Sequence, residues 1–302
     1  MKDYTNGKQL VINWHITEVC NYSCEYCYAK WYKEDRPREL LHNELQVKTL
    51  LNHLYDFFKP SNSKNPLYGK MKWDSVRLNL AGGEPTLYKD KMLMIMETAK
   101  NLGFDVSIIT NGSQFTDFEF LKNMVKHISV LGISLDSFEN YSNKAIGRVN
   151  KKGELLPKQT IIDAIKLAKT VNPTMQLKIN TVVNHKNYHE DMSALIEELT
   201  PEKWKILRML PIVTNSSAVT DEEFESFVER HQHLKQIMRV EDNQDMTESY
   251  IMVDPFGRFF QNSSSLTSGE EYSYSSLIIE HGAEVAFNEM SFSVEKFTAR
   301  YV

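Results

Sequence analysis

The chain has 302 residues, of which 41% are hydrophobic and 25% are charged, and its formal net charge is -5. This length and composition allow a large buried core, and the acidic balance argues against a nucleic-acid-binding surface. The sequence holds no apolar run of the roughly 20 residues that a membrane span needs. Because residues 1–9 are polar, we expect neither an export signal nor a membrane anchor.

Strand-like and helix-like stretches alternate along most of the chain. The strand-like stretches are 10–17, 75–81, 105–110, 128–134, 176–183 and 204–212. The amphipathic stretches between them are 43–58, 89–102, 117–126, 158–171 and 190–199. Such alternation is typical of parallel strands covered by helices, and it predicts an α/β fold built as a partial (βα)6 barrel.

The last third of the chain has a different pattern. Thr220 and Glu223 form a capping box that opens a helix, and the apolar face of this helix extends to Met238. Two short strands and a serine-rich loop follow, at 249–254, 258–261 and 262–276. We therefore expect a barrel, 1–212, and a C-terminal extension, 213–302, that closes the substrate pocket.

Alternation within each strand indicates which side chains point into the barrel. In the first strand Trp14 and its apolar neighbours face the helices, so Asn13, His15 and Thr17 point inward. The same alternation sends further polar side chains inward, namely Arg77, Asn79, Lys178, Asn180, Lys203 and Lys205. An interior of this kind predicts a site for a polar, anionic ligand.

The three cysteines of the chain lie together in Cys20-Asn-Tyr-Ser-Cys24-Glu-Tyr-Cys27. Three thiolates can hold three irons of a four-iron cluster and leave the fourth iron open for chemistry. A disulfide framework would need an even count, and a structural zinc site would need a fourth ligand such as His15 or His42. Reduced cysteines fit a cytoplasmic location.

Three turn sequences follow predicted strands. They are Gly82-Gly83-Glu84-Pro85, Thr110-Asn111-Gly112 and Ser134-Leu-Asp136-Ser137. Ligands of βα barrels collect at the carboxyl ends of the strands, which favours a binding role for these turns. Tight turns and helix caps use the same residue types, so the turns alone do not decide between binding and structure.

The cysteine spacing, with Tyr26 as the aromatic residue before the last cysteine, resembles the signature of the radical S-adenosylmethionine (SAM) superfamily. The resemblance implies a [4Fe-4S] cluster on Cys20, Cys24 and Cys27. It also implies SAM as the source of a 5'-deoxyadenosyl radical. The cofactor-binding residues implied by the same resemblance are Gly82, Gly83, Glu84, Pro85, Asn111, Ser134, Arg148 and Tyr26.

Longer stretches resemble the viperins, radical SAM enzymes that dehydrate nucleoside triphosphates, and specifically their prokaryotic relatives. These stretches are 106–113, 133–138, 146–148, 177–180, 190–192, 204–205, 221–225, 229–231 and 249–250. The similarity extends from about residue 11 to residue 262. The chain departs from the vertebrate pattern at Ala81, where a serine is expected, and it lacks their membrane helix and C-terminal tryptophan.

The viperin resemblance also implies the substrate site. The implied substrate-binding residues are Asn13, Arg148, Lys178, Asn180, Lys203 and Lys205. A triphosphate carries about four negative charges, which several Lys and Arg donors must neutralise away from water. Tyr250 matches a tyrosine that gives up a hydrogen atom late in the reaction, although a core tyrosine would be equally ordinary there.

The resemblance therefore implies a 3'-dehydratase that converts a ribonucleoside triphosphate, CTP or UTP by analogy with vertebrate relatives, to a 3'-deoxy-3',4'-didehydro chain terminator in antiphage defence. The implied partners are the nucleotide and an electron donor such as flavodoxin or ferredoxin, with no nucleic acid and no membrane. Two alternatives stay open: a radical SAM enzyme that modifies a peptide or matures a cofactor, and a non-enzymatic metal-binding redox module.

Overall fold

The computed structural model describes residues 9–29, 38–211, 214–262 and 272–301. The chain forms two compact units. The first unit consists of Met1–Glu18, Trp31–Ser107 and Gln244–Val302, and the second of Val19–Lys30 and Ile108–Asn243. These boundaries differ from the predicted division into a barrel, 1–212, and a C-terminal extension, 213–302. That division stays a prediction.

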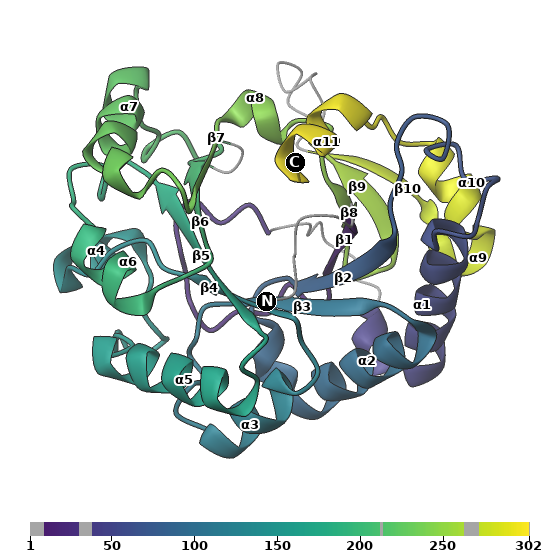
Figure 1. Ribbon diagram of the computed structural model, residues 1–302, viewed down its shortest axis with the longest axis horizontal. Helices are drawn as coiled ribbons and strands as arrows, with labels where there is room; N and C mark the ends of the chain where they lie inside the picture. The colour runs from purple at the N-terminus through teal and green to yellow at the C-terminus, as the bar shows by residue number, and fades with distance from the viewer. Residues whose placement is uncertain (1–8, 30–37, 212–213, 263–271, 302) are drawn as a thin grey trace. The chain divides into compact units, whose positions relative to one another are not determined.

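The sheet of the first unit has a parallel part and an antiparallel part (Figure 1). Its strands, in spatial order, are β10 (Ser273–Leu277), β9 (Arg258–Gln261), β8 (Ile251–Val253), β1 (Gln9–His15) and β2 (Ser75–Ala81). Strand β1 pairs in parallel with both β2 and β8, whereas β9 runs antiparallel to β8 and β10. The strands predicted at 10–17, 75–81 and 249–254 are therefore confirmed as β1, β2 and β8. Each observed strand end lies within two residues of the predicted one.

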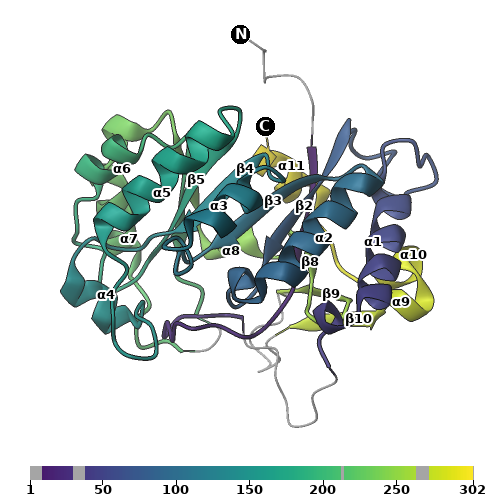
Figure 2. The same ribbon diagram turned by 90° about the horizontal axis from the view of Figure 1, so that it is seen from below.

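Helices α1 (Glu44–Phe58) and α2 (Lys89–Leu102) lie on one side of the sheet of the first unit (Figure 2). The other helices described in this unit are α8 (Asn243–Met246, which begins at the unit boundary), α9 (Ile278–His281), α10 (Ala283–Asn288) and α11 (Val294–Tyr301), with short 3-10 helices at Leu40–His42 and Pro85–Tyr88. Helix α1 packs against α2, α9 and α10. Its buried Phe58 meets Phe259 of β9 and Phe287 of α10, with ring centroids 6.2 and 5.4 Å away.

The second unit is built from parallel strands only. In spatial order these are β4 (Val130–Ser134), β5 (Gln176–Val183), β6 (Lys203–Arg208) and β7 (Met238–Glu241). Its helices are α3 (Phe118–Val125), α4 (Asn140–Ile146), α5 (Lys158–Val171), α6 (Ser193–Leu199) and α7 (Asp221–Arg230), with a 3-10 helix at Gln232–Leu234. Strand β3 (Asp105–Thr110) crosses the boundary between the units.

The alternating βα pattern predicted from the sequence is confirmed, and the capping box of α7 forms as expected between Thr220 and Glu223. Two local predictions are wrong, and one helix was not predicted. Helix α7 ends at Arg230, because residues 238–241 pair with β6 as an edge strand instead of continuing the helix. Helix α4 was not predicted, and β10 lies in the expected serine-rich loop, of which residues 263–271 are outside the described residues.

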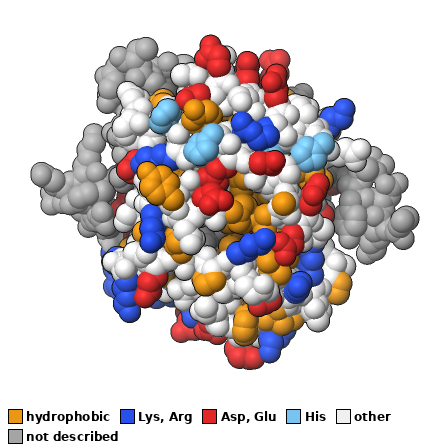
Figure 3. All heavy atoms as spheres, turned by 90° about the vertical axis from the view of Figure 1, so that its left-hand side faces the viewer, with side chains coloured by type: hydrophobic (Ala, Val, Ile, Leu, Met, Phe, Trp, Pro, Cys, Tyr) orange, Lys and Arg blue, Asp and Glu red, His pale blue; other side chains and the backbone are white. Residues whose placement is uncertain are grey.

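The surface of the second unit is mixed in charge. On the face that carries α4, α6 and α7, acidic and basic side chains are interspersed (Figure 3). Acidic residues open α7, where Asp221, Glu222 and Glu223 lie in its first turn. Within the described ranges, no helix combines the length and the apolar character that crossing a membrane takes.

His15, at the end of β1, gives the fold a dependence on pH. It is 2% exposed and packs edge-on against Phe260, and burial lowers its pKa to about 3 from the usual 6.5. Between these two values the unfolded chain binds a proton that the folded chain does not. The contribution of His15 to stability is therefore complete above about pH 6.5 and falls by about 1.4 kcal/mol per pH unit below it.

We expect urea unfolding to show this loss between about pH 7.5 and about pH 5.5. The His15→Gln variant removes the titrating group and should flatten the dependence of unfolding free energy on pH. Other buried groups titrate equally in both proteins, so the comparison isolates His15. The same pH slope in the variant and the unmodified chain would contradict this account.

Candidate active site

The three cysteines lie in the second unit, on one loop that is tied to the end of α4. Ser23 N donates to Gly147 O at 3.2 Å, and Glu25 N donates to Ile146 O at 3.0 Å. Within the loop, Cys27 N donates to Cys24 O at 3.1 Å. None of the three cysteines forms a disulfide, and all three are partly exposed.

Nitrogen donors approach two of these sulfur atoms. Cys20 Sγ accepts from Tyr22 N at 3.4 Å and lies 3.8 Å from Asn111 Nδ2. Cys24 Sγ lies 3.9 Å from Nη1 of Arg148. Burial raises the pKa of the Cys24 thiol to about 12, and the positive charge of Arg148 acts in the opposite direction. Donors of this kind suit sulfur atoms that become thiolate ligands of iron.

The cysteine loop fits an iron–sulfur cluster better than a single metal ion. In the part of the chain that the structure describes, no three His, Cys, Asp or Glu side chains converge closely enough to hold one ion. A four-iron cluster needs no such convergence, because each cysteine binds a separate iron. The three reduced thiols and the donors near Cys20 and Cys24 are therefore compatible with a cluster held by Cys20, Cys24 and Cys27.

A buried polar network lies behind Cys24. Asp136 is fully buried, and its Oδ2 accepts from Arg148 Nη1 at 3.1 Å and from the hydroxyl of Tyr26. Arg148 Nη2 donates to the carbonyl of Ser134 at 2.6 Å. Burial, and after it the charge of Asp136, raise the pKa of Tyr26, which keeps the phenol protonated and able to donate. The predicted residues Tyr26, Ser134 and Arg148 thus form one cluster.

The predicted phosphate-binding residues lie on one face of β5 and β6. In the register of this parallel pair, Lys178 is beside Lys203 and Asn180 is beside Lys205. The residues of opposite parity include Trp204, which is fully buried and donates from Nε1 to Thr181 Oγ1 at 2.9 Å. Strand alternation thus separates a polar block from an apolar face, as the sequence indicated.

Two members of this block are buried. Lys205 Nζ pairs with Glu241 Oε1 of β7 at 2.6 Å, and both side chains are about nine-tenths buried. Asn180 is 6% exposed, and its Oδ1 has no hydrogen-bond partner among the described residues. A buried acceptor of this kind is costly unless a ligand satisfies it, which favours a bound group at this position. The sequence analysis did not find Glu241, although apolar and charged residues alternate in 238–241.

The Lys205–Glu241 pair predicts a large effect on stability. Lys205→Met leaves a buried carboxylate without its counter-ion, so we expect a loss of about 3 kcal/mol in unfolding free energy. In the double variant with Glu241→Gln no charge is stranded, and we expect most of that loss to be recovered. Guanidinium unfolding of the four proteins measures the coupling. Additive effects of the two substitutions would show that the ion pair does not form.

The Gly82-Gly83-Glu84-Pro85 turn lies in the first unit. Gly82 has a φ of +145°, and a Cβ on it would lie 2.5 Å from Thr17 O. Gly83 N donates to the same carbonyl at 2.6 Å. Glu84 is fully buried and caps the 3-10 helix that follows, accepting from Thr86 N at 3.0 Å. Gly82 is therefore required because the turn lies against Thr17, which follows β1 in the chain. The cofactor-binding role of this turn stays a prediction.

Asn13 and Tyr250 lie near one another in the first unit. Asn13 Nδ2 donates to Ile251 O at 3.3 Å, next to Tyr250 in the chain. A polar row continues across the strands, because Asn79 donates to Asn13 Oδ1 at 2.9 Å and accepts from Ser107 Oγ at 2.8 Å. The guanidinium of Arg300 lies 3.7 Å from the centre of the Tyr250 ring. The sequence analysis did not find the contact of Arg300, which α11 supplies from the end of the chain.

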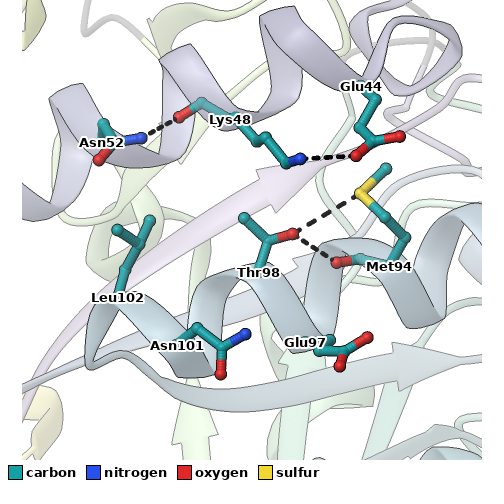
Figure 4. Close-up of a pocket in the computed structure, with 8 residues that line it drawn as sticks. All are labelled: Glu44, Lys48, Asn52, Met94, Glu97, Thr98, Asn101 and Leu102. Atoms are coloured by element: carbon teal, nitrogen blue, oxygen red, sulfur yellow. Dashed lines mark hydrogen bonds and ion pairs between the residues drawn. The ribbon is translucent and has the colours of Figure 1, made fainter.

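A groove of about 420 Å³ lies elsewhere on the first unit, between α1 and α2 (Figure 4). Its lining includes the exposed ion pair of Lys48 with Glu44, and Thr98, which bonds back to Met94 O of its own helix. None of the predicted site residues lines this groove.

Comparison with known proteins agrees with this geometry. The family profile described as the radical SAM superfamily matches residues 14–199. Full-length relatives from Psychrobacter lutiphocae and Pseudoalteromonas ulvae, both named S-adenosylmethionine-dependent nucleotide dehydratase, are 40% and 39% identical to the chain. Each alignment covers 98% of this chain, and it covers 95% and 94% of the respective relative.

Solved structures show the same fold at low identity. Streptococcus suis SuiB bound to its precursor peptide SuiA aligns with a TM-score of 0.62 at 14% identity, over 97% of this chain and 66% of SuiB. The structure of anSMEcpe with bound AdoMet aligns with a TM-score of 0.61 at 14% identity, over 97% of this chain and 79% of the anSMEcpe chain. These likenesses confirm the predicted α/β fold, with an antiparallel C-terminal extension on a parallel sheet.

The chain is therefore a radical SAM enzyme, of the class that uses a [4Fe-4S] cluster and SAM. Within that superfamily it belongs to the family of the S-adenosylmethionine-dependent nucleotide dehydratases, since it matches their full length at up to 40% identity. The family indicated by the sequence motifs is thereby confirmed.

Proposed function

We propose that this enzyme removes water from the ribose of a ribonucleoside triphosphate, with CTP or UTP as the first substrates to test. The observation that carries the proposal is the block of Lys178, Asn180, Lys203 and Lys205 on one face of β5 and β6. It lies in the same compact unit as the cysteine loop. The full-length relatives named as nucleotide dehydratases support this assignment.

In this proposal, different residues bind the cluster and the nucleotide. Cys20, Cys24 and Cys27 hold the cluster, which together with SAM supplies the radical that takes a hydrogen atom from the ribose. The three lysines neutralise the triphosphate, whose charge of about -4 demands several cations. Asn180, whose buried Oδ1 has no hydrogen-bond partner among the residues that the structure describes, accepts a hydrogen bond from the nucleotide. The remaining predicted contacts are those of Asn13 with the nucleoside and of Arg148 with the phosphates and SAM.

The proposed reaction balances as a dehydration. The hydrogen at C4' leaves as an atom, and the hydroxyl at C3' leaves with a proton as water. One electron then completes a double bond between C3' and C4', which gives a 3'-deoxy-3',4'-didehydro nucleotide. Tyr250 is the candidate donor: it gives up a hydrogen atom, which supplies this electron and releases a proton. A carrier such as flavodoxin or ferredoxin then restores the reducing equivalents. A product without a 3' hydroxyl stops chain extension, which suits a role in defence against phage.

The reconstituted enzyme, kept anaerobic and reduced, tests the proposal. Mass spectrometry follows 5'-deoxyadenosine and the nucleotide in separate reactions with CTP, UTP, GTP and ATP. We expect one nucleotide to stimulate cleavage of SAM and to yield a product lighter by one water. Cleavage that no nucleotide stimulates would contradict the proposed substrate class while leaving the radical chemistry intact.

Binding of nucleotide to the cluster-free chain tests the phosphate block separately. We expect Lys178→Met to weaken triphosphate binding by roughly tenfold or more, because a charge-assisted contact is lost. Lys166→Met is the matched control, since Lys166 is exposed on α5, away from this face of the sheet. Titration calorimetry at two salt concentrations measures both variants. Equal affinities would remove Lys178 from the site.

A peptide-modifying radical enzyme is the second candidate, because SuiB is described with a bound precursor peptide. At 14% identity, the similarity to SuiB supports a shared fold and gives no information on the substrate. Enzymes that modify peptides commonly hold additional clusters, and the three cysteines of this chain leave none for a second one. The remaining alternative, a non-enzymatic redox module, does not explain the lysines on one face of β5 and β6. It also disagrees with the enzyme family to which the chain belongs.

A further inference from the structure

Asp136 joins the cysteine loop to the sheet of the second unit. It follows β4 and is fully buried. Its Oδ1 accepts from Val182 N of β5 at 2.9 Å, and its backbone carbonyl accepts from Asn187 Nδ2 at 2.8 Å. Its Oδ2 accepts from Arg148 and from the hydroxyl of Tyr26, which lies between Cys24 and Cys27 in the chain. One carboxylate thus contacts three separate segments.

The position of Arg148 depends on this carboxylate. The Arg148 side chain is 8% exposed and that of Asp136 is 1% exposed, so the pair is shielded from water. A buried guanidinium that lost its counter-ion would carry an uncompensated charge, which costs several kcal/mol. With Asp136 present, Nη2 is fixed on the carbonyl of Ser134 and Nη1 is directed toward Cys24 Sγ.

We propose that Asp136 is a positioning residue that acts through Arg148 and Tyr26 to hold Cys24 and to set the charge that faces its sulfur. This role concerns the cluster and is independent of the proposed substrate. The negative charge of Asp136 cancels the positive charge of Arg148 beside the sulfur. Polar partners that orient metal ligands commonly change metal affinity or activity by roughly ten- to a hundredfold when they are lost.

Asp136→Asn tests the role, because the amide oxygen can still accept from Val182 N, whereas the negative charge and the acceptor for Arg148 and Tyr26 are both lost. After cluster reconstitution we expect a reduction potential more positive than that of the unmodified enzyme, since Arg148 then faces Cys24 without compensation. We also expect faster loss of iron to a chelator. Glu190→Gln is the matched control: Glu190 is also buried and accepts from the neighbouring Ser137 at 2.6 Å, and no hydrogen bond or ion pair joins it to the described residues of the cysteine loop.

The Arg148→Met background separates positioning from simple structural support. If Asp136 acts mainly by compensating the charge of Arg148, Asp136→Asn shifts the potential further in the unmodified chain than in Arg148→Met. The same shift in both backgrounds, or no shift beyond that of Glu190→Gln, would overturn the proposal. If Asp136→Asn does not fold, Tyr26→Phe decides, since it removes only the hydroxyl that bonds Asp136. Faster iron loss in Tyr26→Phe supports the role, and retention equal to that of the unmodified enzyme refutes it.

Discussion

Replacement of Cys24 by alanine is expected to abolish formation of 5'-deoxyadenosine and to lower bound iron after reconstitution. The reason is the ligand count, because the three cysteines of the loop are all the cysteines of the chain and none can replace another. Two thiolates hold a four-iron cluster poorly, so the variant should lose the cluster. The iron with the open position, which receives SAM, is part of that cluster. Iron assay, the absorbance of the cluster and mass spectrometry of the cleaved SAM measure the result.

The fold should tolerate this substitution. Cys24 is partly exposed, and its loop is held to α4 by backbone hydrogen bonds from Ser23 and Glu25 that the change does not touch. Circular dichroism and thermal unfolding of the cluster-free chain should therefore match those of the unmodified protein. Formation of 5'-deoxyadenosine by a folded Cys24→Ala variant would refute the assignment of the cluster to this loop.

Gly147→Ala is expected to displace the cysteine loop although it changes no ligand. Gly147 ends α4 with a φ of +88°, and a Cβ placed there would lie 2.4 Å from the backbone oxygen of Ser23. The obstacle is backbone and not a flexible side chain, so the loop and α4 must move apart. Their two hydrogen bonds, from Ser23 N and Glu25 N, would be strained or lost. We expect at least a tenfold faster loss of iron, in line with other disturbed metal surroundings.

Gly153→Ala supplies the control for Gly147→Ala. Gly153 has a similar φ of +77°, but a Cβ on it would meet no atom within 4 Å. Both substitutions pay the same conformational penalty of about 1 kcal/mol for an L-residue in the left-handed region, whereas only Gly147→Ala adds the collision. Chelator kinetics and thermal unfolding of the two variants isolate the collision. Similar iron loss in both would show that the contact between α4 and the loop does not support the cluster.

Local sequence patterns predicted much of the candidate site. The cysteine spacing predicts the ligands of the cluster, and alternation in 176–183 and 203–208 placed Lys178, Asn180, Lys203 and Lys205 on one face, as the register of β5 and β6 confirms. Such patterns are readable because the period of a strand is two residues and because three thiolates within eight residues must share a loop. The same logic failed at residues 231–241, where a helical apolar pattern continued into an edge strand.

The class of chemistry, the alternation of strands and helices, and the polar face of β5 and β6 could be predicted from the amino-acid sequence, because each depends on residues close together in the chain. The pairing of charges could not be predicted in this way, because it depends on how the elements pack. Asp136 reaches Arg148 and Tyr26, Lys205 reaches Glu241 and Arg300 covers Tyr250 over separations that no periodicity encodes. A buried charge must find its partner through packing of whole elements, so its neighbour is a property of the fold and not of the local pattern.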